Sequence, residues 1–190
     1  MADTPHRLPR DLICALRNYQ VTPTRFILTI EIATQNLRLF QQAKAASTHA
    51  RFARYKFRRN CIISSSLYGV GQLTNSLQTP LGLHRVARKI GGGQPIGTVF
   101  RGRQPIGYVW QGLPNGSIVH RILWLEGLEP GFNRGGNVDT FNRYIYIHGF
   151  GDETTLGRPF SRGCIHVGAS DLIPLFDLLP VGSLVWIGKK

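Results

Sequence analysis

A cysteine and a histidine upstream of it form the pair of residues in this sequence best suited to chemistry. They are Cys164 and His148. A thiol attacks as the thiolate, and a free cysteine with a pKa of ~8.5 is mostly protonated at neutral pH. It therefore needs a base, backbone amides that stabilise an oxyanion, and exposure at the end of a rigid element. Cys164 and His148 can meet these needs, so the sequence indicates acyl transfer through a cysteine nucleophile.

Two predicted strands position these side chains. Residues 144–148 alternate between the two faces of a strand and end with His148. A strand over 164–167 would point Cys164 and His166 to one side and the apolar residues between them into the core. This spacing predicts two histidines near the thiol.

The residues just before the thiol suit an oxyanion hole. Gly163 permits unusual backbone angles, and the amides of Arg162, Gly163 and Cys164 could converge on one oxygen. A simpler interpretation stays open, in which Cys164 is a small packing residue and His148 a histidine at a sheet end. A metal held by His148, Cys164 and His166 is not favoured, because no supporting carboxylate pattern is present. We therefore expect neither a metal nor a cofactor.

The elements around these residues are mostly short strands. Alternation and short apolar runs predict strands over residues 26–32, 37–40, 60–64, 83–87, 109–110, 120–125, 144–148 and 183–187. A helix is predicted after Ser170 as N-cap, and a second short helix over 10–18. The apolar stripe of the first helix is Leu172, Leu175, Phe176 and Leu179. The pattern predicts a mainly β fold, a sandwich or barrel-like arrangement with one or two short helices.

The length of 190 residues suits one domain with a small appendage. We expect an N-terminal extension over 1–24 and a main domain over 25–190, with a probable insertion over 41–59. Basic residues alternate with aromatic ones over 51–59. A solvated surface face is favoured there over binding of single-stranded nucleic acid.

The charge balance points to an anionic partner. Lys and Arg number 23 against 10 Asp and Glu, a net charge of +13. Such a charge suits nucleic acid, an acidic membrane surface or an acidic polymer. No apolar run approaches the ~18 residues of a membrane span, and the run near the N-terminus is too short for a secretory signal. Three cysteines cannot form a disulfide framework, and Cys14 and Cys61 are expected to be structural.

Taken together, the motifs resemble those of the YkuD-type L,D-transpeptidase catalytic domain family. The family signature is HG, then S-x-G-C followed by a hydrophobic residue, which matches His148-Gly149 and Ser161-Arg162-Gly163-Cys164-Ile165. Thr79-Pro80-Leu81-Gly82 resembles its Thr-Pro-x-Gly motif. The strand pair over 26–40 and the closing helix and strand over 171–187 also match in order. The resemblance implies a β-sandwich of mixed sheets.

The resemblance also implies roles for most of the site residues. Cys164 would be the nucleophile, His148 its general base, and the Gly149 carbonyl would orient the His148 ring. Ser161 would brace the loop. The oxyanion hole would come from the amides of Arg162, Gly163 and Cys164. Tyr146 and His166 are candidates for substrate contact because of their places on the predicted strands, not because of the resemblance. Tyr144, Trp110 and Trp124 are further candidates for the cleft. His166 is a departure, because the family often has Arg or Asn there, and this leaves the group that binds a substrate carboxylate open. His166 could itself bind a carboxylate when protonated, or it could compete with His148 as the base.

The implied reaction is cysteine-based transpeptidation of peptidoglycan. A Cys164 acyl-enzyme would form on a stem tetrapeptide with release of D-Ala, and the acyl group would pass to an amine acceptor. One alternative is an L,D-carboxypeptidase or amide hydrolase with the same nucleophile. Another is a non-catalytic basic β-domain that binds an anionic polymer. Expected partners are peptidoglycan stem peptides and other anionic wall polymers, nucleic acid is not favoured, and the expected location is the cell envelope.

Overall fold

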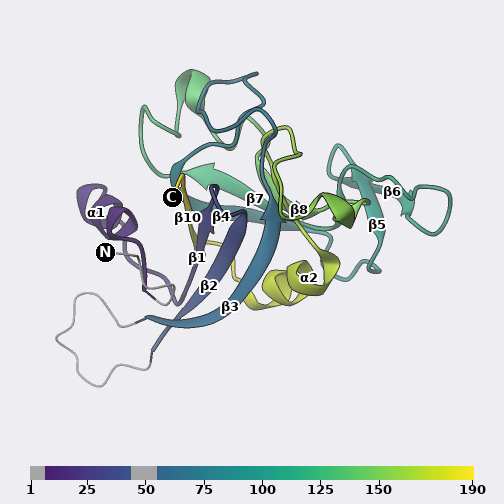
Figure 1. Cartoon of the computed structure of the whole chain (residues 1–190), viewed down its shortest axis with the longest axis horizontal. Helices are drawn as coiled ribbons and strands as arrows, with labels where there is room; N and C mark the ends of the chain where they lie inside the picture. The colour runs from purple at the N-terminus through teal and green to yellow at the C-terminus, as the bar shows by residue number, and fades with distance from the viewer. Residues whose placement is uncertain (1–6, 44–54) are drawn as a thin grey trace.

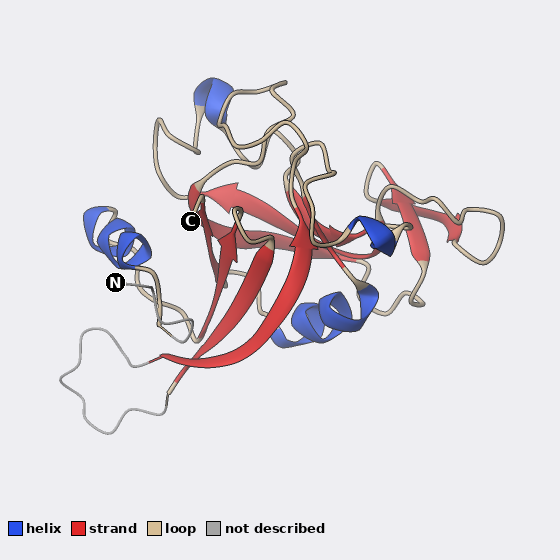
Figure 2. Cartoon of the chain, viewed as in Figure 1, coloured by secondary structure: helices blue, strands red, loops and turns tan. Residues whose placement is uncertain are grey.

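The computed structural model describes residues 7–43 and 55–190 (Figures 1 and 2). The regular structure of these residues consists of two α-helices, ten strands and two short 3-10 helices, η1 (Gly136–Val138) and η2 (Glu153–Thr155). The α-helices are α1 (Arg10–Asn18) and α2 (Ala169–Leu178). The first strands are β1 (Phe26–Glu31), β2 (Asn36–Gln42), β3 (Tyr55–Ser64), β4 (Gly82–Ile90) and β5 (Thr98–Arg101). The others are β6 (Gln104–Tyr108), β7 (Val119–Gly127), β8 (Tyr146–Gly149), β9 (Ile165–Val167) and β10 (Leu184–Gly188). The fold is therefore mainly β, as predicted.

The strands form one mixed sheet that closes on itself. Its order is β4-β10-β1-β2-β3-β9-β8-β7-β5-β6, and β4 also pairs with β7. Eight strands thus make a barrel-like ring, from which the β5–β6 hairpin extends. The β1–β10 and β8–β9 pairs are parallel and the other pairs are antiparallel. The predicted mixed, sandwich-like or barrel-like fold is confirmed.

Helix α2 contributes its apolar side chains to the core that the strands of this ring enclose. Its apolar stripe, Leu172, Leu175, Phe176 and Leu179, belongs to the same buried cluster as inward residues of the strands. Helix α2 also contacts β7 and β8. Burial of this stripe beside the strands fixes β8 and β9, which matters for the site because both strands are short.

Helix α1 packs on the outside of the ring. Leu12 and Leu16 are buried in a second cluster with Ile27, Phe40 and Leu184, which come from β1, β2 and β10. The described part of the expected N-terminal extension is therefore packed onto the main domain. Figure 1 shows α1 and the β5–β6 hairpin at opposite ends of the molecule.

Several element boundaries differ from the predictions. The predicted strand over 109–110 is a turn that follows β6, and the N-cap of α2 is Gly168, so Ser170 lies inside the helix. Strand β3 begins at Tyr55, so the end of the expected insertion over 41–59 is part of the sheet. Residues 44–54 of that insertion, which include residues 51–54 of the basic run over 51–59, lie outside the described residues. Among the described helices, none is long and apolar enough to cross a membrane.

Candidate active site

The candidate site is built on two adjacent parallel strands, β8 and β9. Their register pairs Ile147 with Ile165 and His148 with His166. Since side chains alternate along a strand, Ile147 and Ile165 point into the core and both histidines point to the other face. Cys164 directly precedes β9 on that outer face, as the alternation over 164–167 predicted.

The thiol of Cys164 is held by backbone groups near the start of β8. The Tyr146 N–H donates to Cys164 Sγ at 3.4 Å, and Sγ lies 3.5 Å from the Tyr144 carbonyl, to which it donates. Cys164 is partly exposed. Burial raises the pKa of this thiol to about 11, and the Tyr146 N–H and the nearby Arg143 charge oppose the rise. The resting thiol is therefore protonated at neutral pH and needs a base.

His148 has the tautomer that such a base requires. Its Nδ1 lies 2.7 Å from the Gly149 carbonyl. A carbonyl only accepts, so Nδ1 carries the proton and Nε2 is a free acceptor. Burial lowers the pKa of His148 to about 4, against the opposing effect of the Gly149 carbonyl. His148 is therefore neutral near pH 7. Among the described residues no hydrogen bond joins it to the thiol, so Sγ must leave the Tyr144 carbonyl before it transfers its proton.

Ser161 ties together the loop that carries the thiol. Its buried hydroxyl donates to the Cys164 carbonyl at 2.5 Å and accepts from the Gly163 N–H at 3.2 Å. This contact agrees with the bracing role that the motif implies. It also differs from the expected oxyanion hole, because the Gly163 amide is engaged inside the loop and leaves the amides of Arg162 and Cys164 for an oxyanion.

Glycine is required at position 163 for two reasons. Its φ of +116° lies in the region that other residues avoid. A Cβ there would also lie 3.2 Å from Ile145 Cδ1 and 3.3 Å from the Gln78 carbonyl. The loop over 77–78 therefore forms the floor beneath the nucleophile loop.

His166 lies beside His148 and is not a cation. The two rings are 4.9 Å apart between centroids, and His166 also stacks on Phe150 at a centroid distance of 4.5 Å. Burial lowers the pKa of His166 to about 3. Its Nδ1 is buried and has no hydrogen-bond partner in the described part of the chain. A neutral, covered ring cannot bind a substrate carboxylate by charge, so that group must be sought elsewhere.

Arg143 is a residue near the site that the sequence did not reveal. Its guanidinium donates to the carbonyls of Gly71, Gln72 and Gln78 at 3.1, 2.9 and 2.6 Å. It also donates to Ser76 Oγ at 3.3 Å. One side chain thus fastens the loop over 71–78 beside the thiol. The only signal in the sequence was an arginine next to the alternating run over 144–148, and no motif marks it.

Aromatic side chains line one side of the thiol. Trp124 contacts Tyr144 at 5.5 Å and Tyr146 at 5.4 Å between ring centroids. Tyr144 has a φ of +57° and lies outside β8, so it does not continue the strand as the alternation predicted. Trp110, another expected cleft residue, stacks on Tyr108 at 4.8 Å at the base of the β5–β6 hairpin.

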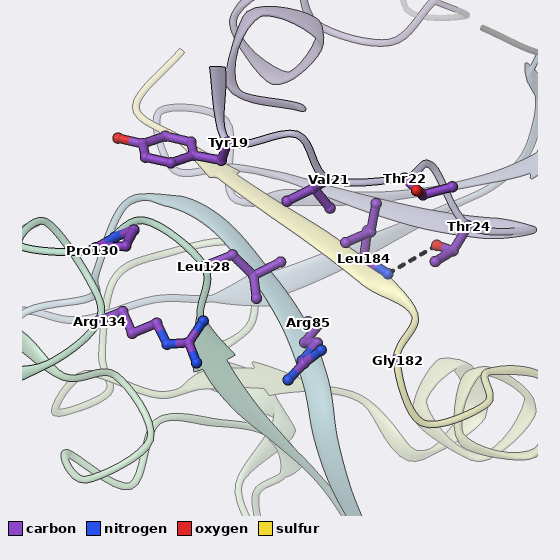
Figure 3. A pocket seen from close by; sticks show the side chains of 10 residues that line it. All are labelled: Tyr19, Val21, Thr22, Thr24, Arg85, Leu128, Pro130, Arg134, Gly182 and Leu184. Carbon is purple, nitrogen blue, oxygen red and sulfur yellow. Dashed lines mark hydrogen bonds between the residues drawn. The ribbon is translucent and has the colours of Figure 1, made fainter. Parts of the chain in front are cut away.

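Other features of the described residues are distinct from this site. No group of three or more His, Cys, Asp or Glu side chains in residues 7–43 and 55–190 could hold a metal ion. A pocket of about 460 Å³ lies between the segment after α1 and strands β4 and β10. Figure 3 shows the side chains that line it. Tyr19, Arg85 and Arg134 are among its lining residues, and it includes none of the predicted site residues.

Comparisons with known proteins agree with the motif order. The family model of YkuD, the L,D-transpeptidase catalytic domain, matches residues 25–187. A search of curated proteins finds no match. Similar solved structures include Bd1075 of Bdellovibrio bacteriovorus, with 12% identity over 87% of this chain and 48% of that chain and a TM-score of 0.52. An L,D-transpeptidase from Mycobacterium smegmatis is 13% identical over 86% of this chain and 58% of that chain, with a TM-score of 0.47.

L,D-transpeptidase 3 from Mycobacterium tuberculosis is similar to the same degree, with 13% identity over 86% of this chain and 61% of that chain and a TM-score of 0.49. The chain spans about half to three fifths of these proteins. At such low identity the likeness concerns the fold, whereas the family match covers most of the chain. The chain belongs to the YkuD family of L,D-transpeptidase catalytic domains.

Proposed function

We propose that this protein is a cysteine L,D-transpeptidase that acts on peptidoglycan stem tetrapeptides in the cell envelope. The observation that carries the proposal is the placement of Cys164 and His148 on one face of β8 and β9. There a partly exposed thiol precedes β9, and His148, a neutral histidine with an unprotonated Nε2, lies on the neighbouring strand β8 at the next position on the same face. The net charge of +13 suits a substrate and wall polymers that carry carboxylates or phosphates.

The first half-reaction forms a thioester. His148 Nε2 takes the proton of the Cys164 thiol, and the thiolate attacks the carbonyl between stem residues three and four. The oxyanion accepts hydrogen bonds from the amides of Arg162 and Cys164. The protonated His148 then gives its proton to the departing nitrogen, and D-Ala leaves as a neutral amine. Burial favours this proton transfer from His148 to the leaving group, because it keeps the pKa of the His148 imidazolium low.

The second half-reaction transfers the acyl group. The side-chain amine of a second stem attacks the thioester while His148 takes its proton. The tetrahedral intermediate collapses, the new amide forms, and Cys164 leaves as the thiolate and regains a proton from His148. Water in place of the amine would give hydrolysis, so the acceptor decides between cross-linking and trimming.

Product analysis by mass spectrometry tests this proposal. Wild type, Cys164→Ala and Cys14→Ser are each incubated with purified disaccharide-tetrapeptide. Cys14 is the matched control, because it is an exposed thiol on α1. We expect cross-linked dimers and free D-Ala from wild type and Cys14→Ser, and neither from Cys164→Ala. Tripeptide and D-Ala without dimers would replace transpeptidation by hydrolysis, and unchanged substrate with folded wild type would overturn the proposal.

A further inference from the structure

The tip of the β5–β6 hairpin holds an arginine in an unfavourable conformation. Arg101 pairs with Gln104, so the turn consists of Gly102 and Arg103 alone. Their φ values are +55° and +70°. A two-residue hairpin turn of this kind needs positive φ at both positions, which glycine and asparagine tolerate and most side chains avoid. An arginine held in a strained turn points to a function of its side chain.

The Arg103 side chain lies over the aromatic residues beside the thiol. Its guanidinium carbon is 5.1 Å from the centroid of the Trp124 ring and 5.0 Å from that of Tyr144. Nη1 donates to Tyr146 Oη at 3.5 Å. Stacking fixes the plane of the guanidinium and leaves most of its five N–H donors available.

The Arg103 charge beside this aromatic cluster has no acidic partner among the residues that the structure describes. The ion pairs among the described residues are Arg38–Glu31, Arg59–Asp171 and Arg85–Glu126. Arg103 takes part in none of them. A pocket of about 670 Å³ next to it is lined by Arg88, Lys89, Arg103 and Trp124 among others, and by no acidic residue. Such a pocket attracts an anionic group.

Tyr146 connects this cation to the reacting thiol. Its hydroxyl accepts from Arg103, and its own backbone N–H donates to Cys164 Sγ at 3.4 Å. Arg103 therefore lies one tyrosine side chain from the nucleophile. In a stem tetrapeptide whose scissile carbonyl is at Sγ, the D-Ala carboxylate is on the residue bonded to that carbonyl. A diamino acid such as meso-diaminopimelate at position three carries a second free carboxylate at the end of its side chain. His166 cannot serve them, because it is buried between His148 and Phe150.

We propose that Arg103, oriented by Trp124 and Tyr146, binds a stem-peptide carboxylate next to the scissile amide and so selects substrates with that carboxylate free. This inference rests on the proposed function, since it concerns the same substrate. A guanidinium binds a carboxylate with two parallel hydrogen bonds, which gives both affinity and orientation.

Two variants on one hairpin test the inference. Arg103→Gly removes the guanidinium and suits the turn, because Gly-Gly is favoured there. Arg101→Gln is the matched control, which removes one exposed cation from the same hairpin. Both are made in Cys164→Ala, and binding is measured by calorimetry with three stem tetrapeptides. One is unmodified, one has the D-Ala carboxylate amidated, and one has the free carboxylate of residue three amidated. Thermal unfolding checks that each variant is folded.

For Arg103→Gly we expect about 10- to 100-fold weaker binding of the unmodified peptide, the range for hydrogen bonds to a charged group. We expect one of the two amidated peptides to bind with equal affinity to the Cys164→Ala parent and to its Arg103→Gly variant. The carboxylate that is amidated in that peptide is the one that Arg103 binds. Arg101→Gln should bind like its parent. Equal loss for all three peptides, or no loss for any, would overturn the inference. Turnover is measured separately with protein that retains Cys164. If Arg103 discriminates between free and amidated carboxylates but no turnover occurs, the proposed function is rejected and the carboxylate site is retained.

Discussion

Replacement of Arg143 by methionine tests how the loop beneath the nucleophile is held. The change keeps the apolar stem of the side chain and removes the guanidinium. Four hydrogen bonds are lost, to the carbonyls of Gly71, Gln72 and Gln78 and to Ser76 Oγ. The carbonyl of Gln78 also lies 3.3 Å from where a Cβ on Gly163 would be. Loss of these bonds therefore loosens the floor of the catalytic loop.

The size of the effect follows from the number and exposure of these bonds. A hydrogen bond to a charged group contributes about 1.5–3 kcal/mol. Four bonds at the lower limit would contribute about 6 kcal/mol, but Arg143 is half-buried, and water can replace part of them. We take half of this sum and expect the free energy of unfolding to fall by about 3 kcal/mol.

The same substitution removes a positive charge near the thiol. The Arg143 charge lowers the pKa of Cys164, which burial has raised to about 11. Its removal must raise that pKa further. Below the pKa, the rate of thiol alkylation falls about tenfold for each unit by which the pKa rises.

Urea denaturation and iodoacetamide alkylation measure the two effects. Alkylation is followed between pH 8 and pH 10 in a Cys14→Ser background, in which Cys61 is 1% exposed and protected. Arg143→Lys keeps the positive charge but cannot form the four hydrogen bonds of the guanidinium. It should therefore be less stable than wild type, while its Cys164 should be alkylated faster than that of Arg143→Met. Arg134→Met, an exposed arginine, is the control. Unfolding within 0.5 kcal/mol of wild type, roughly the scatter for neutral surface changes, together with an unchanged alkylation rate would refute this reasoning.

Three further predictions concern the brace, the pH dependence and the outer helix. Ser161→Ala leaves the Gly163 amide without its acceptor, so stability should fall by about 1–3 kcal/mol and turnover should fall with it, whereas Ser170→Ala should change neither. Buried His84 has its pKa lowered by burial to about 4, below the unfolded value of ~6.5. The unfolded chain therefore binds more protons between these values, and stability falls as pH falls from ~6.5 toward 4. The free energy of unfolding, measured by urea denaturation at pH 7 and pH 5, should depend less on pH in His84→Gln, by about one proton taken up on unfolding. An unchanged pH dependence would contradict this prediction. Leu12→Ala should lower stability by about 2–4 kcal/mol without a change in the turnover of folded protein, because Leu12 packs in the outer cluster; a loss of turnover would reject that separation.

Local patterns were sufficient to predict the strands that carry the site. The alternation over 164–167 placed Cys164 and His166 on one face, and the structure has Ile165 and Val167 in the core. The same rule failed at Tyr144, because a φ of +57° takes that residue out of the strand although the alternation continues through it. Turn conformation of this kind depends on contacts from distant loops, which periodicity does not contain.

The residues that the sequence missed act through tertiary contacts. Arg143 reaches a loop about 70 positions away. The guanidinium of Arg103 meets Trp124 and Tyr146 only because the β5–β6 hairpin pairs with β7, which in turn pairs with β8. Neither arginine belongs to a motif. The predicted roles of Cys164 and His148 stay predictions until chemistry is observed, although the structure places both on the expected face.

An acyl-enzyme on Cys164 is the intermediate on which the account depends most. Wild-type protein is mixed briefly with disaccharide-tetrapeptide, quenched in acid, and measured by intact mass spectrometry followed by peptide mapping. We expect a mass increase of one disaccharide-tripeptide acyl unit, on the peptide that contains Cys164, and no adduct in Cys164→Ala. An adduct on another residue, or cross-linked product from Cys164→Ala, would contradict the central claim that this thiol carries the acyl group.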